Sequence, residues 1–234
     1  MKTIVYLLVY ILLLSIPSSS FLYFIIFTSC KNSFAAPTQL EHSRDVSATN
    51  YNVRFIGKIK KMAGPSFVIR FNSPEQKPAA LGLHVFEKDT LVTKKSKIHL
   101  LLHSDVFLEI GEYTSVQVDY FRIKSGNHDF NLVFHHGIIQ LQLPEASPQS
   151  LFYIKTSYGV FKCAPQTDLF LLEENRQLGF RVLKGSVEFI ANITNEKIKI
   201  DIGGGAHIKV TGLLTKEGPI RSEQIEHLRA ATRL

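Results

Sequence analysis

Apolar and polar residues alternate with a period of two along most of the chain between Tyr51 and residue 215. Such a pattern predicts β-strands that place one face in a core and the other in water. Turn-forming residues separate the alternating stretches: Gly64-Pro65, Ser73-Pro74, His103-Ser104-Asp105, Gly111, Ser125-Gly126-Asn127, Gly137, Gly185 and Gly203 to Gly205. We therefore expect an all-β domain of many short strands, in a sandwich, a barrel or a solenoid. No strong amphipathic helix pattern occurs between 51 and 215, so a parallel βαβ sheet is not expected.

The segment before this domain is strongly apolar. Residues 4–27 carry no charge, and they are long enough to cross a bilayer as a helix, which takes about 20 residues. Lys2 precedes the segment, and positively charged ends tend to stay in the cytoplasm. Only Met1 to Thr3 would then lie in the cytoplasm, so we expect the protein to act in the cell envelope, on the extracytoplasmic (periplasmic) side of the membrane.

Three fates of this leader remain open. An uncleaved membrane anchor is favoured because the apolar run exceeds the roughly 7 to 15 residues of a usual signal-peptide core. A lipoprotein is indicated by Phe27-Thr28-Ser29-Cys30, where small residues precede a cysteine, which makes Cys30 a candidate lipidation site. Simple secretion would follow from cleavage after Ala35.

The chain divides into four parts by composition. We assign 1–29 to the anchor or signal segment, 30–50 to a polar linker, 51–215 to the β domain and 216–234 to a C-terminal tail. The tail contains a predicted short helix, because Ser222 can cap it and Ile225 and Leu228 fall on one face. We expect this helix to cover an open end of the β structure, with docking to a partner as the alternative.

Charge and cysteine content limit the partners. The net charge is +7, but no run of five or six basic residues occurs, so the lysines are interpreted as solvated faces and no nucleic-acid partner is expected. Two cysteines, Cys30 and Cys163, do not make a disulfide framework. We expect Cys163 to be a buried structural thiol.

A series of motifs then identifies a family. Four follow one another in the first half of the domain: Glu87 to Thr93, Ile98 to Leu102, Asp105 to Gly111 and Ser115 to Val118. Five follow in the second half: Gly137 to Leu141, Phe152 to Thr156, Thr167 to Leu171, Val182 to Val187 and Gly203 to Val210. In this order and spacing the chain, over residues 53 to 210, resembles the FecR domain family.

The resemblance implies a compact all-β fold of solenoid-like, β-helix-like character, in which short strands stack in successive turns. The chain departs from the family pattern at several turn positions: Lys88, Val106-Phe107, Ser157 and Gln166. The family's iron–siderophore regulators carry a cytoplasmic segment that handles a sigma factor, for which this chain has no room. The sigma-regulating role is therefore not carried over.

The histidines, the cysteine and the glycine run do not form enzymatic motifs. His99 and His103 would share a face of one strand about 13 Å apart, too far for one metal ion, and the adjacent His135 and His136 would point to opposite sides. Gly203 to Gly205 precedes a strand, whereas a phosphate loop precedes a helix, so we interpret it as a turn. We interpret three aspartates as turn residues that accept hydrogen bonds from nearby backbone: Asp89, Asp105 and Asp168. We expect no catalytic, cofactor-binding or metal-binding residues.

The sequence thus predicts a non-enzymatic scaffold or signalling module of the bacterial cell envelope, which binds an envelope protein or polymer through its strand faces or edges. The alternative is a carbohydrate- or small-ligand-binding protein. That alternative would need Tyr113, Tyr120, Phe121 and Tyr158 to form an exposed aromatic cluster, and we expect these rings to be buried instead.

Overall fold

The computed structural model describes residues 54–219 and 222–232. Seventeen strands and a short C-terminal helix account for nearly all the regular structure in these residues, which confirms the predicted all-β class and the predicted helix. The leader, the linker and Cys30 lie outside the described residues. Within the described residues, no helix combines the length and the apolar composition that crossing a bilayer requires.

The strands form two sheets, which we name sheet A and sheet B. The strand order of sheet A is β4 (His84–Phe86), β1 (Phe55–Ala63), β6 (Lys97–Leu102), β7 (Phe107–Ile110), β9 (Asn127–Gln142), β12 (Asp168–Glu174), β13 (Gln177–Lys184), β16 (Gly205–Lys209) and β17 (Leu214–Glu217). The order of sheet B is β3 (Gln76–Pro78), β2 (Ser66–Ile69), β5 (Thr90–Thr93), β8 (Ser115–Lys124), β9 again, β10 (Leu151–Lys155), β11 (Gly159–Cys163), β14 (Ser186–Ala191) and β15 (Lys197–Asp201). The 3₁₀-helix η1 (His103–Asp105) joins β6 to β7.

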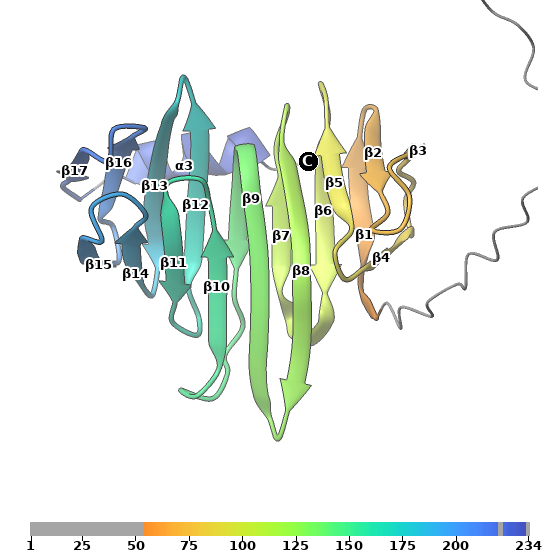
Figure 1. Cartoon of the computed structure of the whole chain (residues 1–234), viewed down its shortest axis with the longest axis horizontal. Coiled ribbons are helices and arrows are strands. Elements are labelled where there is room, and N and C mark those ends of the chain that lie inside the picture. Colours follow the sequence, from red (N-terminus) through yellow and green to blue (C-terminus); the bar gives the residue numbers. More distant parts are fainter. Residues whose placement is uncertain (1–53, 220–221, 233–234) are drawn as a thin grey trace, which may run out of the picture. The chain divides into compact units, whose positions relative to one another are not determined.

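The long strand β9 is the central strand of both sheets (Figure 1). Its first part pairs with β8 and β10 in sheet B, and its last part pairs with β7 and β12 in sheet A. Gly137 lies where the strand passes between the sheets, with a φ of 100°. Four strands therefore flank β9 on each side in each sheet, and the two sheets are joined covalently at their middle.

The pairing differs from the expected β-helix-like stacking. A β-helix pairs its strands in parallel, whereas every ladder between described residues is antiparallel except the one between β9 and β10. The strands also vary in length, because β8 has 10 residues and β9 has 16. The chain thus builds layers from hairpins that alternate between the sheets, and the sheets stay open at their edges.

The space between the sheets is filled by the aliphatic and aromatic side chains of the alternating pattern. Ile98, Leu100 and Leu102 of β6 all point inward and are buried. Rings from the two sheets meet in this core: Phe180 of sheet A lies 4.8 Å from Phe161 of sheet B, centroid to centroid. Burial of this apolar surface is the main source of stability for such a fold.

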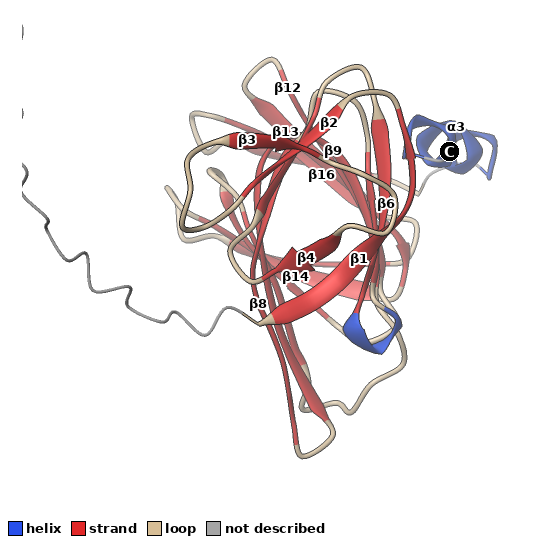
Figure 2. Cartoon of the chain, turned by 90° about the vertical axis from the view of Figure 1, so that its right-hand side faces the viewer, coloured by secondary structure: helices blue, strands red, loops and turns tan. Residues whose placement is uncertain are grey.

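Helix α3 (Ser222–Thr232) lies across the outer face of sheet A (Figures 1 and 2). The Nζ of Lys97 in β6 donates a hydrogen bond of 2.8 Å to the carbonyl of Ala230, and the helix also contacts β9. The expectation that this helix covers an open end of the β structure is therefore wrong. The physical reason is that sheet A has apolar side chains on its outer face as well, and the helix packs on them.

Candidate interaction face on sheet A

The outer face of sheet A contains a buried aromatic side chain, Phe170. Leu169 and Leu171 on either side of it point into the core between the sheets, so Phe170 points outward. Its exposed fraction is nevertheless only 3%. Phe170 and Leu228 of α3 line the same cavity, so the helix shields this ring from water. The sheet and the helix thus form a second, smaller apolar contact outside the main core.

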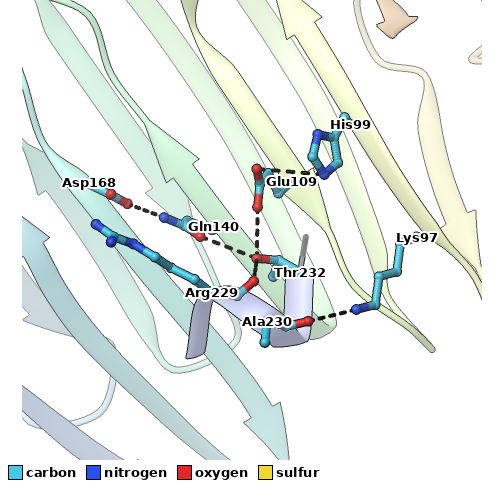
Figure 3. Close-up of polar contacts among 8 residues, drawn as sticks. All are labelled: Lys97, His99, Glu109, Gln140, Asp168, Arg229, Ala230 and Thr232. Carbon is cyan, nitrogen blue, oxygen red and sulfur yellow. Dashed lines mark hydrogen bonds and ion pairs between the residues drawn. The ribbon is translucent and has the colours of Figure 1, made fainter. Parts of the chain in front are cut away.

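A polar network fixes the C-terminal end of α3 on the sheet (Figure 3). Thr232 is fully buried, and its hydroxyl lies 2.9 Å from Glu109 Oε2 and 3.3 Å from Gln140 Oε1. The Nε2 of Gln140 donates a hydrogen bond of 2.8 Å to Asp168 Oδ1. His99 Nε2 lies 3.6 Å from Glu109 Oε1. One threonine of the helix therefore connects β7 and β9.

Beside this contact, a cavity of about 360 Å³ lies between α3 and strands β12, β13, β16 and β17. Its lining comprises Phe170, Leu172, Gly179, Phe180, Arg181, His207, Glu217, Gln224, His227 and Leu228. Apolar atoms make up most of this lining, and the polar groups converge from three strands and the helix. A second hollow shares Leu172, Gly179 and His207 and continues toward the β12–β13 turn. We refer to the cavity and this hollow together as the sheet A groove.

The polar rim of the groove is organised by one carboxylate. Glu217 of β17 forms an ion pair with Arg181 of β13 and a polar contact with the ring of His207 of β16. Arg181 also donates a hydrogen bond of 2.7 Å to the carbonyl of Gly218. A Cβ at Gly179 would come within 3.0 Å of the His207 ring, so the absence of a side chain there makes room for the imidazole. These three side chains hold one another in place before any partner arrives, which lowers the entropic cost of binding.

The histidines and the cysteine that the sequence offered as candidate reactive groups are distributed over β6, the 3₁₀ turn, β9 and β11. His103 follows β6 in the 3₁₀ turn rather than within the strand, and its Nε2 contacts the carbonyl of Phe55. His135 and His136 are both exposed on β9. Cys163 is buried, as expected, and burial raises the pKa of its thiol to about 12. No group of three His, Cys, Asp or Glu side chains in the described part of the chain is placed to hold a metal ion.

The three aspartates have different roles. Asp89 accepts a hydrogen bond of 2.8 Å from the backbone N–H of Phe86, as the turn interpretation requires, and it also pairs with Arg70. Burial raises the pKa of Asp89, although Phe86 and Arg70 act in the opposite direction. Asp105 lies in the 3₁₀ turn. Asp168 is the first residue of β12 and accepts a hydrogen bond from Gln140, so it belongs to the polar network under α3.

The four aromatic residues of the ligand-binding alternative do not form a cluster. Tyr113 is 62% exposed, Phe121 is buried in the core, and Tyr120 and Tyr158 are half-buried. Tyr158 donates a hydrogen bond of 3.0 Å to Glu173, and burial together with this carboxylate raises the pKa of Tyr158 to about 12. Each ring therefore belongs to a different local environment.

Sequence reasoning missed the sheet A groove. A signal was present in Leu169-Phe170-Leu171-Leu172, where alternation gives way to an unbroken apolar run. Such a run is typical of a strand buried on both faces. The pairing of Glu217 with Arg181 and His207 had no comparable signal, because those residues are 36 and 10 positions apart from it and belong to three different strands.

No protein-family model matches the sequence, and no curated protein matches it either. Two crystal structures of a candidate anti-sigma factor from Parabacteroides distasonis ATCC 8503 align with TM-scores of 0.47 and 0.48, at 10% and 11% sequence identity. Each alignment covers 58% of this chain and 61% or 62% of that chain. The similarity therefore spans little more than half of this chain and less than two thirds of the chain from Parabacteroides distasonis.

Proposed function

We propose that this protein is a non-enzymatic, FecR-like interaction module of the bacterial cell envelope, which binds a protein partner through the sheet A groove. The observation that carries the proposal is Phe170, an outward-facing aromatic ring that α3 covers while leaving a largely apolar cavity beside it. Apolar floors with preset polar rims are typical of protein-binding sites, in which a few central side chains supply most of the affinity.

The chemistry of the groove favours binding over catalysis. His207 and Arg181 are both engaged by Glu217, which fixes their orientation. The one cysteine in the described residues stays protonated at neutral pH, because burial raises its pKa to about 12. A thiol in that state is a poor nucleophile. The rim is suited to recognising a partner that presents an apolar side chain flanked by hydrogen-bonding groups.

Site-specific photocrosslinking in bacterial membranes tests the proposed partner site. A photoreactive benzoylphenylalanine placed at His227 on the rim should yield a discrete protein adduct. Introducing Leu172→Lys on the floor should abolish that adduct, whereas Lys162→Asp, on the exposed face of sheet B, should leave it intact. Adducts that persist in the Leu172→Lys background would refute the groove as the binding site.

The proposed location rests on the uncharged run of residues 4–27 and has its own test. Mass determination of the mature N-terminus separates the three fates of the leader. A start at Met1 indicates an anchor, an acylated Cys30 indicates a lipoprotein, and a start at Ala36 indicates secretion. Recovery of the mature protein from the cytoplasmic fraction with an intact leader would contradict an envelope location.

A second candidate function, the binding of a small ligand, is favoured by the volume of the cavity. About 360 Å³ falls at the lower end of the range of small-molecule sites, roughly 300 to 1,000 Å³. Thermal unfolding with glucose, N-acetylglucosamine and maltose as probes tests this function. A rise in Tm that the Leu172→Lys variant lacks would support it, and an unchanged Tm with all three would exclude these sugars.

A further inference from the structure

One sheet edge differs from the other three. Among the described residues, β3 and β4 are edges of three residues each, and β3 ends in Pro78, which cannot donate a backbone hydrogen bond. The edge β17 is followed closely by α3. The edge β15 of sheet B has five residues, contains no proline and alternates strictly between exposed and buried side chains. An open edge of this kind is a template for another strand.

The backbone of β15 has hydrogen-bonding groups available on its outer side. The N–H of Ala191 bonds to the carbonyl of Glu196, which sets the phase of the ladder between β14 and β15. By the alternation of an antiparallel ladder, the backbone groups of Lys197, Lys199 and Asp201 then face away from β14. The carbonyl of Asp201 accepts a hydrogen bond from Gly204 within its own turn and keeps a second lone pair.

We propose that a second copy of this chain pairs with the β15 edge, antiparallel, about a two-fold axis at Lys199. The charges of the strand are self-complementary in this register. Lys197 of each copy lies opposite Asp201 of the other, which gives two opposite-charge pairs across the axis. Lys199 meets its own counterpart, but Asp201 lies 3.7 Å from Lys199 within each chain and offsets that repulsion. Opposite charges directly across strands stabilise pairing, and like charges oppose it.

The apolar side chains support the same register. Ile198 and Ile200 point into the core. In the proposed pair, Ile198 of one copy lies opposite Ile200 of the other, so sheet B continues across the axis. Ile202 is 67% exposed, and it comes level with Glu196 of the second copy. Glu196 ends the turn that contains Ile193, which is 64% exposed. The pairing therefore brings two exposed isoleucines of different copies to the same end of the interface.

Crosslinking of the full-length chain in detergent tests the register directly. A Lys199→Cys variant places a thiol on the two-fold axis, and a short bis-maleimide should join two copies. Unsubstituted protein measures any background from Cys30 and Cys163. Lys162→Cys, on β11 within sheet B, is the matched control and should give no more dimer than that background.

A charge exchange makes the test specific. Adding Lys197→Asp to the Lys199→Cys chain places an aspartate opposite Asp201 of the other copy on each side of the axis. Both cross-strand pairs are then repulsive. The protein concentration needed for half-maximal crosslinking should then rise at least about tenfold. Adding Asp201→Lys as well restores both opposite-charge pairs, and this concentration should return to within about threefold of its original value. Circular dichroism checks that each variant keeps its β structure.

Two results would overturn the proposal. One is a yield of crosslinked dimer from the Lys199→Cys variant that is no greater than the yield from the Lys162→Cys variant. The other is a loss of crosslinking in the variant with Lys197→Asp that the addition of Asp201→Lys fails to reverse. The experiment is independent of the sheet A groove, because β15 belongs to the other sheet. A failure here leaves the proposed partner site untouched, and a failure of the photocrosslinking test leaves this edge pairing untouched.

Discussion

At the scale of single residues, position 137 accepts no amino acid other than glycine without strain. Its φ of 100° lies in the left-handed region, and a Cβ there would come within 2.4 Å of Thr114 Oγ1 and 2.5 Å of Thr114 Cα. The hydroxyl of Thr114 in turn accepts a hydrogen bond of 2.9 Å from the N–H of Ile138. Backbone conformation and close packing therefore both require glycine where β9 passes between the sheets.

We predict that Gly137→Ala lowers the free energy of unfolding by at least about 2 kcal/mol, because strain and a steric clash add. Urea unfolding followed by circular dichroism measures the change. Gly126→Ala is the matched control, since its φ of 77° is also positive but no atom lies within 4 Å of the added Cβ. It should cost only about 1 kcal/mol. Equal losses for the two variants would contradict the proposed role of the Thr114 contact.

Cys163 gives a second prediction at this scale. Because burial raises the pKa of its thiol from 9.0 to about 12, the folded protein holds this proton while the unfolded chain releases it above pH 9. The stabilising contribution of the protonated thiol is thus complete below pH 9 and is lost as the pH rises toward 12. We expect no iodoacetamide labelling of Cys163 at pH 8 in the folded protein and full labelling in urea, as read by peptide mass spectrometry. Rapid labelling of the folded protein would show that the thiol is accessible.

At the scale of elements, α3 is held by a few specific contacts rather than by an extensive apolar stripe. Leu228 lies at the Phe170 cavity, and Thr232 is the point at which the helix enters the polar network. Most of the other helix side chains whose exposure is described remain at least partly in water. The docking of α3 on sheet A therefore depends strongly on individual hydrogen bonds.

We predict that Thr232→Val weakens the docking of α3 by about 1 to 3 kcal/mol, because the sheet loses the one hydroxyl proton that the helix offers to Glu109 and Gln140 while the side-chain volume stays nearly the same. Hydrogen exchange should become faster in α3 and unchanged in β8. Thr211→Val, at an exposed turn position, is the control and should leave the exchange of α3 unchanged. Unchanged exchange in the Thr232→Val helix would mean that the network does not hold it.

Alternation and turn residues predicted the strand class correctly because these signals are local. The stretch around Ile98, Leu100 and Leu102 forms β6, and Gly64, Gly137 and Gly185 all have positive φ at corners of the fold. The sheet A groove could not be predicted in the same way. It depends on Arg181, His207 and Glu217 reaching one rim from three strands, and spacing along the chain does not encode that proximity.

At the scale of the whole molecule, β9 is the strand that connects the two sheets. Fraying from an edge strand removes one ladder, whereas loss of β9 would divide both sheets at once. Phe130, Leu132, Phe134, Ile139 and Leu141 of this strand are all buried in the core. Cooperative unfolding units usually coincide with such densely connected elements.

We therefore predict that hydrogen exchange is slowest in β9 and fastest in the edge strands β3, β4 and β17. Mass spectrometry of peptic fragments under native conditions measures both. The free energy of opening in β9 should equal the global free energy of unfolding, because β9 exchanges only when the entire domain opens. The free energy of opening in the edge strands should be much smaller. Comparable protection in β9 and in β3 would indicate that the sheets open independently of their shared strand.

Local patterns in the sequence were enough to predict the strand-forming stretches, the turn glycines, the C-terminal helix and the buried face of strands such as β6. These features depend on side-chain periodicity and backbone preference, which act over a few residues. Three other features emerged from long-range packing: β9 joins the two sheets, α3 lies beside Phe170, and Glu217 contacts Arg181 and His207. Those outcomes depend on which distant strands pair and on which outer face still has apolar surface to bury. That choice is made by the free energy of the folded molecule as a whole.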